Sequence, residues 1–163
     1  MKSWTEEEAL NRAASFCVSA ERSVKDVRQK IEGWGLESDV VERILRRLVD
    51  ERFVDEVRFC NAFVKDKLRF NKWGKQKISL ELYKKGIDSS LRSAALSEID
   101  DEEYERVLLS VLETKRRSIK EKDERTLKMK LFRFALGRGF ESGVVSSCLK
   151  MADLSEDGDA FFE

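Results

Sequence analysis

Apolar residues recur at three- and four-residue spacing along most of this chain, with polar residues between them. This period is typical of helices that bury one stripe and expose the rest. Three of the apolar segments end at a glycine, namely Gly35, Gly86 and Gly139. Glycine enters the left-handed conformation that closes many helices without steric cost. The pattern therefore predicts three helices that end in a glycine turn, each followed by a second helix.

The three glycine turns share one order of apolar positions. These positions lie eight and four residues before the glycine and one, five, nine and ten residues after it. They are occupied by Val27, Ile78 and Leu131; Ile31, Leu82 and Ala135; Leu36, Ile87 and Phe140; Val40, Leu91 and Val144; and Ile44-Leu45, Ala95-Leu96 and Cys148-Leu149. The glycines are spaced 51 and 53 residues apart. We interpret this likeness as a tandem repeat.

A third helix is predicted before each pair, over about 5–18, 55–70 and 101–121, and the last of these is the longest. Its basic run at 115–120 is expected to extend past the packed part. The expected helix starts are a capping box from Thr5 to Glu8 and N-caps at Ser23, Asp88, Asp100 and Ser142.

The predicted fold class is all-α, with three tandem three-helix repeats stacked into an elongated, curved body. Neighbouring repeats should stack because a repeat of about 50 residues has little core of its own. The predicted boundaries are 1–50, 51–99 and 100–152, followed by an acidic, disordered tail over 153–163.

The composition excludes several kinds of catalytic and metal-binding site. The 163 residues include no histidine and no proline, and 39% of them are charged. Without histidine, the chain cannot form a Ser-His-Asp triad, a Cys-His pair or a histidine-bound metal site. The cysteines are Cys17, Cys60 and Cys148, an odd set without a C-x-x-C pair. We interpret them as reduced core residues.

Short motifs for cofactors and metals are also missing. Gly137-Arg138-Gly139 lacks the third glycine of a dinucleotide loop and is better explained as a helix cap. Gly74-Lys75 follows a single tryptophan and not a phosphate-binding loop. The carboxylates at 100–103 would face different directions on a first helical turn and complement the helix dipole. We expect no catalysis, no cofactor and no metal.

The chain also lacks the apolar run of a signal peptide, and no stretch approaches the ~18 apolar residues of a membrane span. We expect a soluble, cytoplasmic protein without a membrane partner. A monomer is the expected oligomeric state, since 32 basic residues balance 32 acidic ones.

The zero net charge hides blocks of one sign. Residues 65–92 carry nine basic and three acidic side chains, and residues 106–133 carry ten and four. Between them, residues 93–105 carry six acidic side chains and no basic one. Blocks this long create local fields, so the two basic blocks favour a binding role. Trp73 lies among lysines, where it could stack on a base or could staple two helices together.

Four stretches of the chain form recognisable motifs: Glu21–Ile31, Arg52–Cys60, Gly74–Ile87 and Phe134–Phe140. Together they resemble the RecX family of recombination regulators. Gly74–Ile87 is the most specific of them, and Phe134–Phe140 is similar to the family's closing module. The resemblance covers about residues 9–150. The chain departs from the family pattern with Asp26-Val27 in place of Glu-Leu, Cys60 in place of alanine, and Gly137 in place of a larger residue.

The resemblance implies a non-enzymatic protein of DNA repair, recombination and the SOS response. Such proteins bind RecA and its filament on single-stranded DNA, lodge in the filament groove, and inhibit recombinase, ATPase and co-protease activities. We take the basic residues of the two blocks as candidate contacts with the RecA filament or with DNA phosphates. The central contact comprises Arg69, Lys72, Lys75, Lys77, Lys84 and Lys85, and a second contact comprises Lys115, Arg116, Arg117 and Lys120.

A rival interpretation is a helical-repeat module that binds DNA directly, because repeated helix pairs resemble tandem DNA-reading units. The second helices of the pairs hold few unopposed basic residues, which disfavours sequence-specific reading. Weak binding to single- or double-stranded DNA is compatible with both interpretations. A helical scaffold for an unrelated partner is the third alternative.

Overall fold

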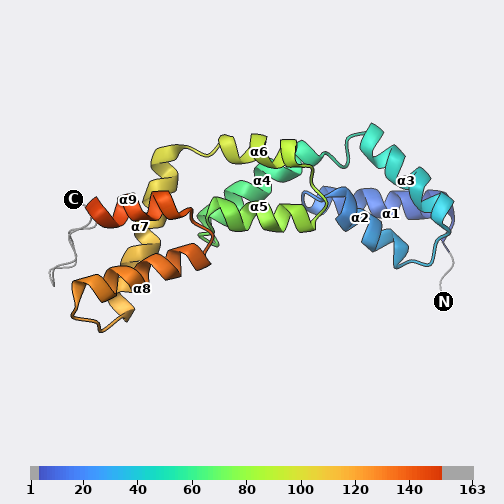
Figure 1. Cartoon of the computed structure of the whole chain (residues 1–163). Helices are drawn as coiled ribbons and strands as arrows, with labels where there is room; N and C mark the ends of the chain where they lie inside the picture. The colour runs from blue at the N-terminus through green and yellow to red at the C-terminus, as the bar shows by residue number, and fades with distance from the viewer. Residues whose placement is uncertain (1–3, 152–163) are drawn as a thin grey trace. The chain divides into compact units, whose positions relative to one another are not determined.

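The computed structural model describes residues 4–151. Figure 1 shows this range as helices joined by short turns, and no strand occurs among the described residues. The described helices are α1 Glu6–Ser19, α2 Val24–Glu32, α3 Ser38–Asp50, α4 Glu56–Arg69, α5 Lys75–Lys84, α6 Ser89–Ser97, α7 Asp101–Ser118, α8 Glu124–Gly137 and α9 Ser142–Met151. None of them is both long and apolar enough to cross a membrane. The all-α class and the three-helix repeats are confirmed.

Capping side chains fix where these helices begin. The predicted caps at Thr5, Ser23, Asp88 and Asp100 each accept a hydrogen bond from a backbone N–H of the following helix, at 3.1, 3.1, 3.2 and 3.0 Å. The Glu8 carboxylate accepts a hydrogen bond from the Thr5 amide and completes the predicted capping box. Each cap satisfies a donor that the helix itself leaves without a partner.

Two predicted helix ends differ from the structure. The helix α9 begins at Ser142 itself, so the cap position belongs to Glu141 and the prediction of Ser142 as the cap is wrong. The Glu141 carboxylate instead accepts a hydrogen bond from the Tyr104 hydroxyl, a long-range contact that a local pattern does not show. The helix α7 ends at Ser118, short of 121, because Ile119 is extended with φ −101° and ψ 128°.

The glycine turns confirm the repeat. Gly35, Gly86 and Gly139 have φ of 76°, 76° and 98°. After Gly86 and Gly139, the next amide donates to the carbonyl four residues before the glycine, at 3.1 Å in both turns. This bond is typical of a helix closed by a left-handed residue. The positions eight and four residues before each glycine are fully buried in all three copies: Val27, Ile78, Leu131, Ile31, Leu82 and Ala135.

The chain divides into two compact units, which we call unit 1 and unit 2. Unit 1 contains the residues through Phe63 together with Leu82–Ala95, and unit 2 contains Val64–Glu81 together with the chain from Leu96 onward. The middle repeat therefore contributes to both units. The boundaries 1–50, 51–99 and 100–152 stay a prediction, and the predicted tail over 153–163 lies outside the described residues.

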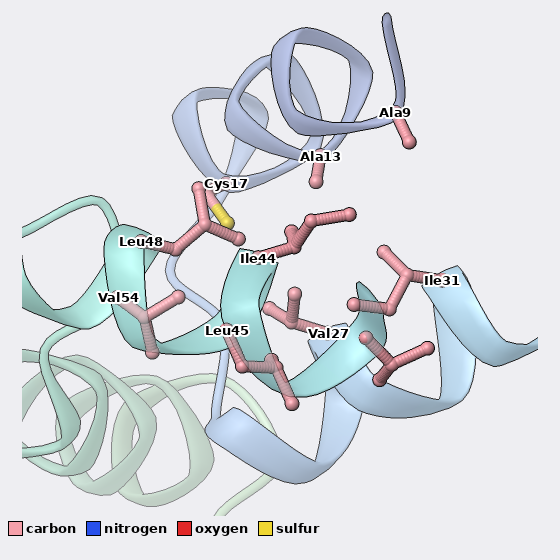
Figure 2. Close-up of a cluster of buried hydrophobic side chains, with 10 residues drawn as sticks. Ala9, Ala13, Cys17, Val27, Ile31, Ile44, Leu45, Leu48 and Val54 are labelled. Atoms are coloured by element: carbon pink, nitrogen blue, oxygen red, sulfur yellow. The ribbon is translucent and has the colours of Figure 1, made fainter. Parts of the chain in front are cut away.

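In unit 1, the first three helices enclose a core in which α1 supplies small residues. Ala9, Ala13 and Cys17 of α1 face apolar side chains from α2 and α3 (Figure 2). Small side chains let the helix axes approach closely, and the larger partners fill the remaining space. These partners are Val27, Ile31, Ile44, Leu45 and Leu48, with Val54 beside them.

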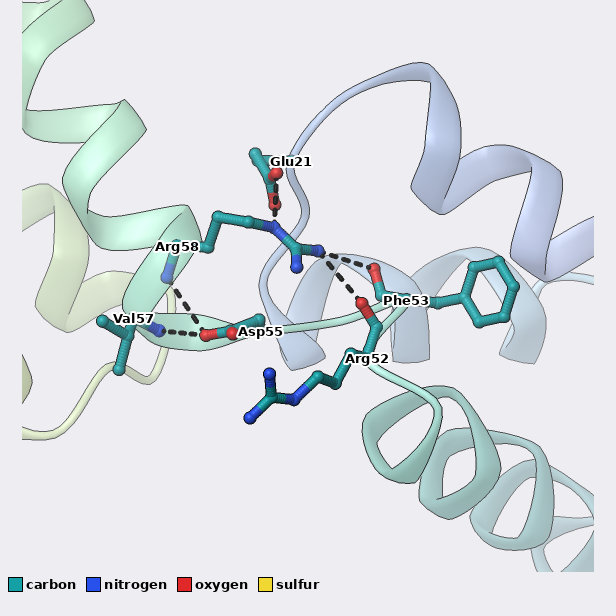
Figure 3. Close-up of polar contacts among 6 residues, drawn as sticks. All are labelled: Glu21, Arg52, Phe53, Asp55, Val57 and Arg58. Atoms are coloured by element: carbon teal, nitrogen blue, oxygen red, sulfur yellow. Dashed lines mark hydrogen bonds and ion pairs between the residues drawn. The ribbon is translucent and has the colours of Figure 1, made fainter.

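An arginine in unit 1 ties the start of α4 to the chain just before it. Arg58 Nη2 donates to the Arg52 and Phe53 carbonyls at 3.2 and 3.4 Å, and Arg58 Nε lies 2.6 Å from Glu21 Oε1 (Figure 3). Arg52 has φ of 61°, which is uncommon for a residue other than glycine. The arginine therefore holds a left-handed linker, and Glu21 neutralises its charge.

In unit 2, two turns meet backbone to backbone. The Gly74 amide donates to the Arg138 carbonyl at 2.8 Å, and the Gln76 amide donates to the Gly139 carbonyl at 3.0 Å. A Cβ atom on Gly74 would lie 2.3 Å from backbone atoms of Gly139 and Phe140, closer than real Cβ contacts come. The α4–α5 turn can approach the α8–α9 turn this closely only with glycine at position 74.

A buried tyrosine adds a side-chain link in unit 2. The Tyr104 hydroxyl accepts a hydrogen bond from the Lys75 amide at 2.9 Å and donates one to the Glu141 carboxylate. Burial and the bond to Glu141 raise the pKa of Tyr104 well above its usual value of 10.0. The hydroxyl is therefore protonated at neutral pH, as its role as a donor requires.

Candidate partner-binding site

The ten predicted contact residues are divided between the two units. Lys84 and Lys85 belong to unit 1, and the other eight belong to unit 2. The six residues expected to form one central contact therefore do not lie in one compact unit. Binding by the ten remains a prediction, and they differ in what each cation contacts within the protein.

Ion pairs within the protein engage Arg69, Lys85 and Arg117 among the ten. These are Arg69 Nε with Glu103 Oε1 at 2.6 Å, Lys85 Nζ with Asp26 Oδ1 at 2.8 Å, and Arg117 Nη2 with Glu113 Oε1 at 2.8 Å. Burial alone would raise the pKa of Asp26, but hydrogen bonds from Lys85 and Ser23 outweigh burial and lower it. A carboxylate this close offsets much of the attraction that a cation exerts on a partner. These three side chains therefore offer a partner less charge than a cation without an acid beside it.

Four other cations contact neutral groups. Lys72 Nζ donates to Ser110 Oγ at 2.8 Å. The ammonium groups of Lys75, Lys77 and Lys115 lie over the rings of Tyr104, Trp73 and Phe134, each 4.7 Å from the ring centroid. A ring attracts a cation without neutralising it, so these lysines keep their full charge. Within the described residues, no carboxylate pairs with any of the four.

Lys120, Arg116 and Lys84 complete the ten candidates. Lys120 is exposed beyond the end of α7, and Arg116 is partly buried in that helix. The Lys84 carbonyl accepts a hydrogen bond from Lys25 Nζ at 2.7 Å. None of these contacts gathers the three into one group.

Trp73 lies at the junction of α4 and α5 and is partly buried. Its amide donates to the Lys67 carbonyl at 3.0 Å. The ammonium groups of Lys67 and Lys77 lie 5.0 and 4.7 Å from its ring centroid. The ring thus contacts a residue from each of the two helices, which favours the staple over the base-stacking interpretation.

A pocket of about 290 Å³ in unit 2 brings residues from both predicted contacts together. We call it the cationic pocket; its lining residues are Lys72, Val111, Thr114, Lys115, Ser118, Phe134 and Arg138. Lys72 comes from the α4–α5 turn, Lys115 from α7 and Phe134 from α8. The fold therefore places one cation of the central contact and one of the second contact around a single depression.

Arg138 is a pocket residue that the sequence analysis missed. Arg138 Nη2 donates to the Asn71 carbonyl and to the Lys72 carbonyl, the latter at 3.3 Å. Lys72 has φ of 55°, so this arginine also holds a left-handed residue. A basic residue before a cap glycine is explained equally well by the helix dipole, so the sequence carries no separate signal for this contact.

Asp100, Glu103 and the three cysteines have structural roles. No group of three or more His, Cys, Asp or Glu within residues 4–151 is placed to hold a metal ion. Asp100 caps α7, and Glu103 from the same acidic run binds Arg69. The cysteines are reduced and buried, as predicted, and burial raises the pKa of Cys60 to about 11.

The comparison with known proteins identifies the family. Residues 55–96 match the model of the second three-helix domain of RecX, and residues 101–149 match that of the third. Regulatory protein RecX of Clostridium acetobutylicum is 32% identical over 146 residues, which cover 87% of this chain and 67% of the relative. This chain belongs to the RecX family. Its relatives are named as regulatory proteins, in agreement with the predicted non-enzymatic role.

Another RecX relative and a solved RecX structure are also similar to this chain. Regulatory protein RecX of Oceanobacillus iheyensis is 29% identical over 153 residues, and the match spans 91% of this chain but 54% of the relative's length. The crystal structure of RecX from Lactobacillus salivarius matches with a TM-score of 0.79 at 20% identity, over 87% of this chain and 92% of that one. This structural likeness supports the shared helical fold.

Proposed function

We propose that this RecX family member binds RecA and its filament on single-stranded DNA in the cytoplasm, lodges in the filament groove, and inhibits recombinase, ATPase and co-protease activities. Family membership over most of the chain is the observation that carries this proposal. The elongated, curved body predicted from the sequence belongs to the same proposal.

Cations whose charge is not neutralised within the protein supply the attraction. Lys72, Lys75, Lys77 and Lys115 contact only neutral side-chain groups in the described range, so their charge can act on acidic RecA surfaces. Contacts of this kind weaken with salt, because the charges are exposed and screened. A protein that touches several protomers could stabilise bound segments or block the addition of new ones.

The DNA-dependent ATPase activity of RecA tests the proposal. Purified protein is added below one copy per RecA protomer, with circular dichroism as the check of folding. We expect a strong loss of ATPase activity well below equimolar amounts, since one bound copy would affect more than one protomer. An unchanged ATPase rate at equimolar protein would contradict the proposed function.

Direct DNA binding is the alternative, and mobility shift without RecA at physiological ionic strength separates the two. Tight binding of DNA alone would favour a DNA-binding module, whereas inhibition that needs RecA and ATP favours the filament regulator. One observation disfavours base reading: α9, the second helix of the last pair, carries Lys150 as its one basic residue. Sequence-specific readers present several basic or amide side chains from such a helix.

A further inference from the structure

Two arginine contacts in this protein are built alike. In unit 1, Arg58 donates to the carbonyls of Arg52 and Phe53, and Arg52 has φ of 61°. In unit 2, Arg138 donates to the carbonyls of Asn71 and Lys72, and Lys72 has φ of 55°. In both, one guanidinium nitrogen holds a left-handed turn that leads into the next helix.

The two contacts differ in whether a carboxylate pairs with the arginine. Arg58 Nε lies 2.6 Å from the Glu21 carboxylate, which accepts its hydrogen bond and neutralises its charge. Arg138 Nε and Nη1 have no acceptor among residues 4–151, and no carboxylate in this range pairs with Arg138. Guanidinium nitrogens that remain beside a pocket favour a planar anion such as a carboxylate.

Two further cations surround the same pocket. Lys72 is held by Ser110 Oγ, and Lys115 lies over the Phe134 ring, so neither is neutralised. Three positive charges from the α4–α5 turn, α7 and the α8–α9 turn therefore line one depression of about 290 Å³. An anion entering it would meet all three.

Apolar side chains also line the pocket. Val111 is 6% exposed, and Phe134 is partly buried. Lys115 covers one face of the Phe134 ring at 4.7 Å, so that face is closed to a stacked nucleobase. The volume is at the low end of ligand pockets and suits one apolar side chain next to an acid. This combination favours a peptide over a nucleotide.

We propose that the cationic pocket docks an acidic segment of a partner protein. One carboxylate of that segment takes on Arg138 the place that Glu21 takes on Arg58, and the neighbouring apolar side chain rests on Val111 and Phe134. Lys72 and Lys115 attract the flanking acids. This inference deepens the proposed function when the partner is RecA, and it makes an acidic segment of RecA the contacting part.

The test removes two pocket charges and spares Arg138, which holds the turn. The double variant Lys72→Asn with Lys115→Met is compared with Arg43→Gln with Arg47→Gln. The control lies in a unit 1 pocket that we call the balanced pocket, lined by Glu6, Glu7, Leu10, Arg43, Ile44 and Arg47. Both variants lose two positive charges, so a difference between them reports the pocket and not the net charge.

A peptide probe tests the pocket without RecA. Fluorescence anisotropy follows a fluorescein-labelled peptide with two acidic residues on each side of a leucine–phenylalanine pair. We expect the Lys72/Lys115 variant to bind it about tenfold or more weakly than the wild type, and the Arg43/Arg47 variant to bind within about twofold. A peptide with serines in place of the acids should bind no protein. Equal binding by wild type and both variants, or tighter binding of labelled oligo(dT) through the pocket, would overturn the inference.

Inhibition of the RecA ATPase then links the pocket to the function. The Lys72/Lys115 variant should need about tenfold more protein for half-inhibition, and the Arg43/Arg47 variant should act like the wild type. An inactive wild type contradicts the proposed function, whereas an active wild type with an equally active pocket variant contradicts this inference. The two proposals therefore fail separately.

Discussion

The balanced pocket of unit 1 and the cationic pocket of unit 2 both contain basic side chains, but these have different partners. Arg43 lies 2.7 Å from Glu6, and Arg47 lies 3.1 Å from Glu51. Lys72, Lys115 and Arg138 instead contact a hydroxyl, a ring and carbonyls. The fold therefore leaves the charge of some basic residues available to a partner and offsets that of others, and this distinction needs the structure.

The glycine turns of the two units differ in a similar way. Gly35 and Gly86 of unit 1 have φ of 76° and nothing within 4 Å of a Cβ built on them. Gly139 of unit 2 has φ of 98°, and its Cβ would lie 2.4 Å from Lys77 Cβ. In unit 1 the glycine serves its own helix end, whereas in unit 2 it also makes room for a neighbouring turn.

The largest expected effect follows from this difference. Gly139→Ala combines left-handed strain with overpacking, so we expect it to lower the free energy of unfolding by about 3 kcal/mol. Gly74→Ala, which forces backbone against backbone, should have a similar effect of about 3 kcal/mol. Gly35→Ala and Gly86→Ala should each cost about 1 kcal/mol, since only strain is added. Urea unfolding measures all four.

Thiol labelling can show which of the two units a glycine substitution destabilises. Cys148 lies in unit 2, and Cys17 and Cys60 lie in unit 1. Burial raises the pKa of all three thiols, so labelling near pH 8 requires local opening. Gly139→Ala should speed the labelling of Cys148 more than that of Cys60. Equal acceleration at both would show that the two units do not open separately.

Much of this fold could be predicted from the sequence, because the features that define the repeat are local. Periodic apolar residues, cap side chains and a glycine at each turn are set within one repeat, and Val27, Ile78 and Leu131 are buried as their spacing predicted. The contact of Gly74 with Gly139 joins residues far apart in sequence, so no local pattern predicts it. The hydrogen bond from the Tyr104 hydroxyl to Glu141 likewise joins distant residues.

Tyr104→Phe should have the next largest effect. The change leaves the Lys75 amide and the Glu141 carboxylate without the hydroxyl, so we expect unit 2 to lose about 2 kcal/mol of unfolding free energy. Tyr83 in unit 1 is 65% exposed, and Tyr83→Phe is the matched control with no measurable loss. Chemical unfolding at pH 7 gives both values, and equal losses would contradict the proposed link.

The same tyrosine predicts how stability responds to base. The pKa of Tyr104 is raised in the folded protein, so the folded state keeps a proton that the unfolded state loses above about pH 10. Its contribution is complete below that pH and falls as the pH rises further. The wild type should therefore lose stability between pH 9 and 11 more steeply than Tyr104→Phe, as melting temperatures at each pH would show.

The next prediction compares Lys85, which is in an ion pair, with Lys115, which lies over an aromatic ring. Lys85→Met removes the ion pair with Asp26, so we expect a loss of about 1–2 kcal/mol at pH 7. The pKa of Asp26 is lowered when folded, and the contribution of this pair is present above the unfolded value near 3.8 and disappears as the pH falls further. Lys115→Met should cost at most about 0.5–1 kcal/mol at any pH.

The sequence predicted only part of the arrangement of the candidate residues. The charge blocks drew attention to Lys72 and Lys115, which the fold brings to one pocket. They did not separate these residues from Arg69, Lys85 and Arg117, whose acids are distant in sequence or lie one turn away on the same helix. Arg138 was interpreted only as part of a helix cap, since its contacts with Asn71 and Lys72 depend on the packing of two turns.

The smallest expected change in stability belongs to Lys72→Asn, and its sign is informative. Lys72 has φ of 55°, where asparagine is tolerated better than lysine. The variant loses one bond to Ser110 and relieves some strain, so its unfolding free energy should stay within about 0.5 kcal/mol of the wild type or rise. Binding of the acidic peptide should nevertheless fall several-fold, because one of the three pocket charges is gone.

A residue that serves only the turn would show the opposite result, with binding intact and stability lowered. Melting temperature and peptide anisotropy on the same preparation decide between a lysine that serves the fold and one that serves a partner.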